Sequence, residues 1–132
     1  MAQSVFSLDG RYYDVRILKL ERAASILDGE NAGRVLSGSM DRDIIGTYYN
    51  YNLEIDGSNL DPDEYDELFD TITAPVESHT VRFPYGKRGE VEFEAYISSA
   101  KDELVRKDEN GDNIWSGISL SFVAMDPYRL PE

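Results

Sequence analysis

A regular alternation of apolar and polar residues in the middle of the chain constrains the fold more than any other feature of the sequence. In the stretch GTYYNYNLEID, residues 46–56, one side of an extended chain would carry Tyr49, Tyr51, Leu53 and Ile55. The opposite side would carry Tyr48, Asn50, Asn52 and Glu54. Large β-forming residues at a period of two are typical of a strand that buries one face. We therefore expect Tyr49 and Tyr51 to lie in the core, whereas Tyr48 is a candidate for an exposed contact.

The same period returns in the second half of the chain. Residues 79–83, HTVRF, and residues 90–98, EVEFEAYIS, are separated by the turn sequence PYGKRG, which predicts a β-hairpin. A charged segment follows at residues 101–113, and we expect it to be a connection with a tight turn at its Asn-Gly pair. A last strand is predicted within residues 115–127, with the apolar positions Ile118, Leu120, Phe122 and Ala124.

The strand signals before residue 46 are less regular. Residues 12–20, YYDVRILKL, begin with apolar residues on one face, and the phase then shifts at Leu18, which suggests a β-bulge or burial on both faces. Residues 28–33, DGENAG, are rich in turn formers and predict a loop. Residues 34–40, RVLSGSM, could form a short strand, although Gly38 weakens that prediction.

One segment carries the signature of an α-helix. Asp61 can cap the helix, Pro62 suits its first position, and Glu64 completes a capping box. An apolar stripe follows at Tyr65, Leu68, Phe69 and Ile72. The helix is therefore expected over about residues 61–73, ending before Pro75 and packing on the sheet. Together the elements predict a mainly β fold of the α+β type, an antiparallel β-sandwich or barrel with one packed α-helix.

A chain of 132 residues is expected to form a single domain over residues 1–132. We expect residues 1–11 to be an N-terminal arm and residues 126–132 to be an extended C-terminal tail that two prolines restrict. The turn-rich loop and this tail are the candidate contact segments. With the outward tyrosine, they give the candidate interface residues Tyr48, Asp28, Gly29, Asn31, Tyr128 and Arg129.

The charge balance argues against several kinds of partner. There are 26 acidic residues and 13 basic ones, a formal net charge of −13. Nucleic acids and anionic membranes are bound through clustered Lys and Arg, so we expect no specific nucleic-acid binding and no membrane association. Residues 44–81 contain no Lys or Arg. This stretch is either a solvated acidic face or a surface that repels phosphate or attracts a basic partner.

The sequence also lacks the residue patterns of the common catalytic and metal sites. There is no cysteine, and His79 is the only histidine, which excludes a multi-histidine metal centre. The segment DENGD, residues 108–112, resembles a calcium loop only superficially, because its glycine comes too early and the final glutamate ligand is missing. No phosphate-binding glycine loop is present. We therefore expect no enzyme activity, no catalytic residues, no cofactor and no metal.

Four stretches of the sequence together resemble a known family. They are GSMDRDIIGTYYNYNLEID, DPDEYDELFDTITAP, VRFPYG and WSGISLSFVAMDPYRLP. They are similar to small tail proteins encoded in phages and prophages of Gram-positive bacteria, the tail-tube and distal-tail-like proteins. The resemblance extends over about residues 12–131 and depends on the order of the elements and on a closing P-x-R-x-P motif. Family hairpins are often longer than any that is evident in this sequence.

The resemblance implies a non-enzymatic structural protein of the virion. In this family, subunits join edge to edge into rings, and stacked rings enclose the channel through which DNA passes. The expected role is a tube, connector or baseplate component of the tail. The expected partners are further copies of the chain and other tail proteins, in the virion tail and, during assembly, in the cytoplasm of the bacterial host. An acidic lumen would keep DNA from adhering to the wall.

Two other functions remain as alternatives from the residues alone. The first is a carbohydrate- or peptide-binding β-sandwich module in which Tyr48, Tyr96 and Trp115 form an exposed stacking platform. The second is a small hydrolase that uses carboxylates of the predicted helix, among them Glu64. Exposure of the three aromatic rings on one face would favour the first alternative, and a positioned pair of acids would favour the second.

Overall fold

The computed structural model describes residues 6–57 and 60–132 and has an antiparallel sheet of seven strands as its main element. These strands are β1 (Ser7–Leu8), β2 (Arg11–Tyr12), β3 (Arg16–Asp28), β6 (Ile44–Asp56), β7 (His79–Tyr85), β8 (Gly89–Lys107) and β9 (Asn113–Ala124). A separate two-stranded sheet consists of β4 (Gly33–Arg34) and β5 (Met40–Asp41), and the helix is α1 (Pro62–Ile72). The predicted mainly β class with one packed helix is confirmed.

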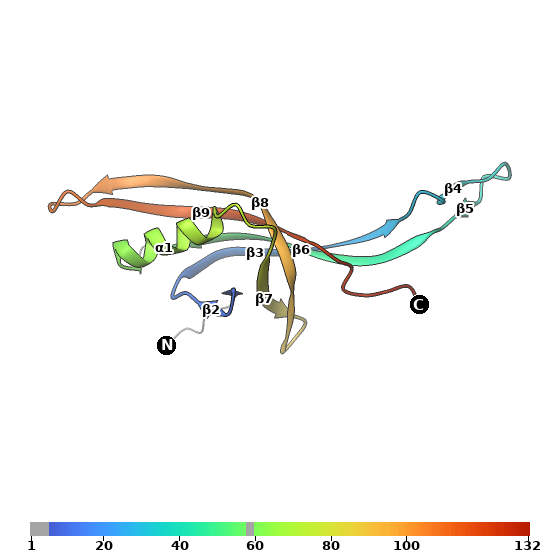
Figure 1. Ribbon diagram of the computed structural model, residues 1–132, viewed down its shortest axis with the longest axis horizontal. Helices are drawn as coiled ribbons and strands as arrows, with labels where there is room; N and C mark the ends of the chain where they lie inside the picture. The colour runs from blue at the N-terminus through green and yellow to red at the C-terminus, as the bar shows by residue number, and fades with distance from the viewer. Residues whose placement is uncertain (1–5, 58–59) are drawn as a thin grey trace.

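The order of strands in the large sheet is β2-β1-β7-β8-β9-β6-β3. The long strand β8 joins its two halves, because residues 89–95 pair with β7 and residues 95–107 pair with β9. In Figure 1, β7 runs at a steep angle to the long β3–β6 and β8–β9 ribbons. The sheet is therefore strongly bent, and its two halves pack against each other. The space between the two halves is filled by buried aromatic and aliphatic side chains, among them Phe6, Tyr51, Phe83 and Phe122.

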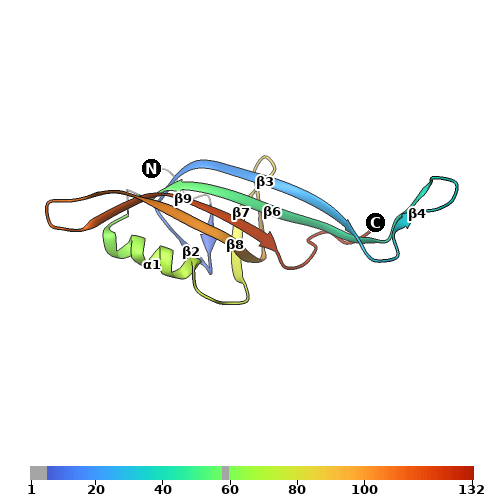
Figure 2. The same ribbon diagram turned by 90° about the horizontal axis from the view of Figure 1, so that it is seen from above.

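The predicted helix is confirmed together with its start signal. The carboxylate of Asp61 accepts a hydrogen bond of 2.9 Å from the backbone N–H of Glu64, and Pro62 opens the helix. The buried face carries Tyr65, Leu68 and Ile72, and Phe69 is packed partly against the same core. The helix lies alongside the β8–β9 ribbon in Figures 1 and 2.

Two long β-ribbons extend from this core toward opposite ends of the molecule (Figures 1 and 2). The β3–β6 ribbon leads into the small β4–β5 hairpin at one end, and the β8–β9 ribbon ends in a turn at the other. Residues 101–113 are therefore not a plain connection as predicted. Residues 101–107 continue β8 and pair with β9, and only residues 108–112 form the turn, in which Gly111 has a φ of 85°.

The ends of the chain also differ from the sequence-based expectation. Residues 1–5 of the expected N-terminal arm lie outside the described residues, but residues 7–12 form the β1–β2 hairpin and Leu8 is buried in the core. Apolar side chains here gain more from burial than an extended arm would allow. The C-terminal segment is extended, and it folds back onto β6 through hydrogen bonds between Thr47 and residues 128–129.

Candidate interaction arm and acidic groove

The β3–β6 ribbon and its β4–β5 tip carry an unusual concentration of exposed apolar side chains. We call residues 26–45 the arm. Its exposed large hydrophobic side chains are Ile26, Leu27, Val35, Leu36, Met40, Ile44 and Ile45. Leu36 is fully exposed at the tip. Strand β9 pairs with β6 only over residues 51–55, so the arm lies beyond the part of the ribbon that the rest of the sheet supports. An apolar surface of this kind is typical of a protein–protein contact.

Hydrogen bonds at the tip of the arm fix the turn that carries the exposed Val35 and Leu36. At the tip, the backbone N–H of Gly38 donates to the carbonyl of Val35 at 2.8 Å, and Arg34 Nη1 donates to the carbonyl of Gly38 at 3.0 Å. Gly38 has a φ of 90°, a conformation that glycine adopts easily. The sequence suggested a single strand over residues 34–40, but Gly38 reverses the chain there, and residues 35–39 form a turn between the short strands β4 and β5.

The base of the arm is closed by an ion pair. Arg42 Nε donates to both carboxylate oxygens of Asp28, at 2.8 and 3.0 Å, and the backbone N–H of Asp43 adds a bond of 3.2 Å. The hydrogen bond from Arg42 holds the pKa of the Asp28 carboxyl below its usual range. Gly29 lies so close to Asp43 that an added Cβ would be 2.7 Å from the carboxylate. Asp28 and Gly29 were predicted as contact residues. In the structure they hold the two strands together at the base of the arm, Asp28 by its hydrogen bonds and Gly29 by its close approach to Asp43.

The six predicted contact residues all lie along this one ribbon. Asp28, Gly29 and Asn31 surround the base of the arm, and Tyr48 is half-buried on β6 opposite Ser25 of β3. Tyr128 and Arg129 bond to Thr47 of the same strand. Sequence reasoning missed the aliphatic residues of the arm. The available signal was the apolar Val35-Leu36 pair inside a Gly- and Ser-rich turn, where polar residues are usual.

A tyrosine cluster anchors the C-terminal segment next to the arm. The hydroxyls of Tyr49 and Tyr85 are 3.1 Å apart, and the ring of Tyr128 lies 5.8 Å from that of Tyr49. The hydrogen bond from Tyr85, with a smaller effect of Arg129, lowers the pKa of Tyr49. Tyr49 and Tyr51 are both buried, which confirms their predicted place in the core.

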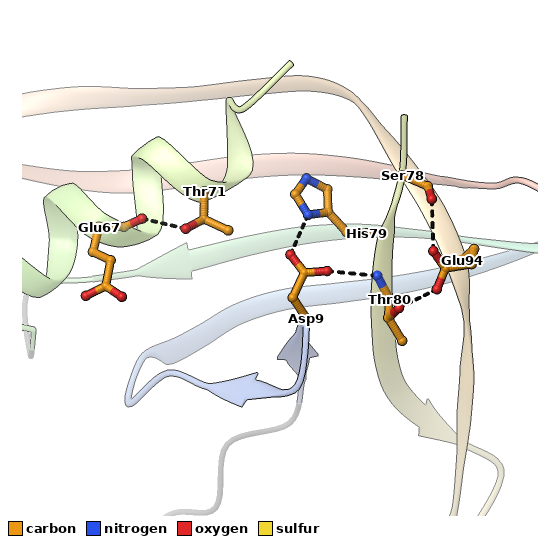
Figure 3. Close-up of polar contacts among 7 residues, drawn as sticks. All are labelled: Asp9, Glu67, Thr71, Ser78, His79, Thr80 and Glu94. Atoms are coloured by element: carbon orange, nitrogen blue, oxygen red, sulfur yellow. Dashed lines mark hydrogen bonds and ion pairs between the residues drawn. The ribbon is translucent and has the colours of Figure 1, made fainter. Parts of the chain in front are cut away.

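A second surface feature is an open groove of about 640 Å³ between α1 and β7. Its lining residues are Asp9, Asp63, Asp66, Glu67, Asp70, Thr71, Ala74, Val76, Ser78 and His79. Nδ1 of the buried His79 is 2.7 Å from Oδ2 of Asp9, whose other oxygen accepts from the backbone N–H of Thr80 at 3.0 Å (Figure 3). This pair ties the β1–β2 turn to β7. We call this feature the acidic groove.

In the acidic groove, none of the described hydroxyls is placed to act as a nucleophile with His79. A histidine that activates a side-chain nucleophile needs a hydroxyl or thiol within hydrogen-bond reach. The three hydroxyls drawn in Figure 3 bond elsewhere: Ser78 donates to Glu94 at 2.9 Å, Thr80 donates to the same carboxylate, and Thr71 donates to the carbonyl of Glu67 at 2.8 Å. Asp61 is occupied in capping the helix. In residues 6–57 and 60–132, no group of acidic or histidine side chains is arranged to hold a metal ion.

The three aromatic residues of the predicted stacking platform are not brought together. Trp115 packs against the core and lines a small cavity beside Pro62 and Tyr65. Tyr48 is half-buried on the face of β6 that points away from the core, and Tyr96 is exposed on β8 opposite Val123. Because Trp115 faces the helix side, these residues form no continuous flat surface for a sugar ring or peptide.

Comparison with known proteins adds no assignment to these observations. Neither a scan against protein-family models nor a search of curated proteins returned a match. Within the part of the chain that the structure describes, the single helix is too short to cross a membrane.

Proposed function

We propose that this protein is a non-enzymatic structural component of a phage tail, a tube, connector or baseplate subunit that assembles with further copies of itself into a ring. The observation that carries the proposal is the projecting arm with its exposed Leu36. An apolar surface on an ordered, hydrogen-bonded hairpin costs solubility in a free monomer, and burial against a neighbouring subunit would remove that cost.

A second feature supports assembly along the sheet. Strand β3 is the outermost strand at one end of the sheet order, so one edge of its thirteen residues has no partner strand in the described chain. A long open edge is an aggregation hazard unless another strand or a subunit covers it. In a ring, each subunit would cover the edge of its neighbour. The resemblance to small tail proteins in the order of elements supports the same proposal.

The acidic helix fits the passage of DNA through such a ring. Asp63, Asp66 and Asp70 are exposed on α1, and no described cation forms an ion pair with them. Like charges disfavour contact between DNA and a protein wall. The assembled protein would be found in the virion tail, and unassembled subunits in the host cytoplasm.

Light scattering coupled to size exclusion, followed by negative-stain microscopy of the largest species, tests the proposal. The expected result is a mass that grows with protein concentration toward closed rings or stacked rings of uniform diameter. A protein that remains a monomer at the highest soluble concentration, with no ring in the micrographs, would overturn it.

A further inference from the structure

We propose, on the basis of the function proposed above, that the tip of the arm of one copy docks into the acidic groove of a second copy. The tip, residues 31–40, presents Arg34 beside the exposed Val35 and Leu36. The groove combines carboxylates on its rim with apolar atoms of Ala74 and Val76.

The polar groups of the groove are hydrogen-bond acceptors. The carboxylates only accept, and Nδ1 of His79 is hydrogen-bonded to Asp9, which leaves the second ring nitrogen, Nε2, to face an occupant of the groove. Figure 3 shows this second ring nitrogen turned away from Asp9, and none of the described residues bonds to it. The hydroxyl protons of Thr71 and Ser78 are already donated within the chain. A groove with these groups requires an occupant that brings donors.

The rim of the groove also carries carboxylates that are not neutralised by a described cation. Arg11 pairs with Glu67, but among the described residues no cation pairs with Asp63, Asp66 or Asp70. Apolar contact is available between these acids, because Val76 is exposed beside Ala74. The groove therefore matches a protein segment that carries a cationic side chain next to aliphatic ones. A metal ion or a sugar would not supply both the positive charge and the aliphatic side chains.

The tip of the arm has this composition. Arg34 is the only charged residue among residues 31–40, and one of its N–H groups bonds to Gly38 while the guanidinium has five to offer. Ser37 and Ser39 add hydroxyl donors. Leu36 at the turn can reach the apolar atoms of the groove while Arg34 meets its carboxylates, since a guanidinium pairs well with carboxylates.

The geometry makes this contact intermolecular. The β4–β5 tip lies at one end of the long axis of the molecule, whereas α1 lies toward the other end in both views (Figures 1 and 2). Tip and groove of the same copy cannot meet. A contact between two different surfaces is head-to-tail, and it repeats from copy to copy into a closed ring or a filament.

The absence of cysteine in the sequence allows a direct test by disulfide trapping. One variant carries Leu36→Cys at the tip, and a second, size-tagged variant carries Val76→Cys in the groove; both positions are exposed, so folding is retained. The matched control replaces the groove variant by Glu109→Cys in the β8–β9 turn. In air-saturated buffer, where dissolved oxygen accepts the two electrons released by each pair of thiols, the mixed disulfide between tip and groove should form at least about tenfold faster than with the control, because docking raises the effective thiol concentration.

A charge exchange tests the role of Arg34. Arg34→Glu in the tip variant should slow the mixed disulfide about tenfold, the loss expected for one charge-assisted contact. Asp70→Arg in the groove variant should restore part of the rate, whereas Arg34→Gln should give an intermediate rate. Equal rates for all three tip variants would contradict the assigned pairing.

The outcomes separate this inference from the proposed function. A tip–groove disulfide no faster than the control, in a sample that still forms rings, would overturn the docking mode alone and leave the groove to a partner other than a second copy. The same slow rate in a sample that remains monomeric would overturn both proposals.

Discussion

The ring of Tyr51 stacks on the ring of Phe83, with centroids 4.3 Å apart and planes at 10°. These residues belong to β6 and β7, which are separated by two other strands in the sheet order. The contact therefore joins the two halves of the folded sheet, and the Tyr51 hydroxyl adds a hydrogen bond of 3.1 Å to the carbonyl of Pro84. Tyr51 and Phe83 thus pack the two halves of the sheet together in the core from which both ribbons project.

Removal of the Tyr51 ring should destabilise the protein severely. Tyr51→Ala leaves a cavity beside Phe83 and should lower the free energy of unfolding by about 3–5 kcal/mol, the usual cost for a large buried aromatic ring. Tyr51→Phe keeps the stacking and loses only the bond to Pro84, at a cost of about 1 kcal/mol. Urea denaturation followed by circular dichroism measures both. Similar midpoints for the two variants would contradict the role assigned to the ring.

Loss of the Asp9 carboxylate should release the β1–β2 hairpin. Asp9 bonds to His79 and Thr80, and its φ of 53° is one that Asp and Asn tolerate better than Ala. Asp9→Ala should cost about 1–3 kcal/mol, and Asp9→Asn clearly less, because the amide oxygen still accepts a hydrogen bond. Amide hydrogen exchange in β1 and at Val81, its partner in β7, reports the change. Unchanged protection in Asp9→Ala would refute the anchoring role.

Tyr65 should make the free energy of unfolding depend on pH in the alkaline range. Its burial, together with a hydrogen bond of 3.0 Å to Asp102, raises the pKa of the phenol above the usual value of 10.0. The unfolded chain then loses this proton first, so the contribution of Tyr65 is complete below about pH 10 and declines as pH rises toward the folded-state pKa.

The corresponding variant is Tyr65→Phe, which should cost about 1 kcal/mol near neutral pH. The difference in melting temperature between wild type and variant should narrow from about pH 9 to about pH 11, since only the wild type has this titration. The other tyrosines are common to both proteins and cancel in the difference. A difference in melting temperature that stays constant or widens over this range would show that folding does not raise the pKa of the Tyr65 hydroxyl.

Gly46 permits the C-terminal segment to lie on β6. A Cβ at this position would be 2.5 Å from the carbonyl oxygen of Arg129 and 2.6 Å from Cβ of Pro127. Gly46→Ala should displace the segment and accelerate tryptic cleavage after Arg129 by about tenfold, because cleavage follows the population of the open form. Gly33→Ala is the matched control, since its Cβ would meet no atom within 4 Å. Equal cleavage of both variants would argue against the close contact.

The elements that the sequence predicted well are those whose signals are local. The alternation from Tyr49 to Ile55 needs only one buried face, and the cap at Asp61 needs only the next three residues. Both were confirmed. The Asp9-Gly10 pair at the β1–β2 turn is also a local hairpin signal, but residues 1–11 were expected to be an arm, so this hairpin was missed.

The features that could not be predicted depend on distant pairing. Residues 101–107 look like a charged linker because all of them except Asp102 are exposed in the two-stranded ribbon, so no apolar alternation marks the strand. The doubling of the sheet brings Tyr51 to Phe83, and no local pattern encodes that contact. The arm was missed for the related reason that its apolar side chains are exposed, so they follow no pattern of burial.

Sedimentation velocity of the wild type and of Leu36→Ser, over the same range of concentrations, tests the central claim that the arm mediates self-assembly. Leu36 makes no contribution to the core, so the variant should retain the melting temperature of the wild type. We predict that the wild type forms species of increasing size and that Leu36→Ser remains a monomer. Identical sedimentation of the two proteins, whether both assemble or both stay monomeric, would contradict the account.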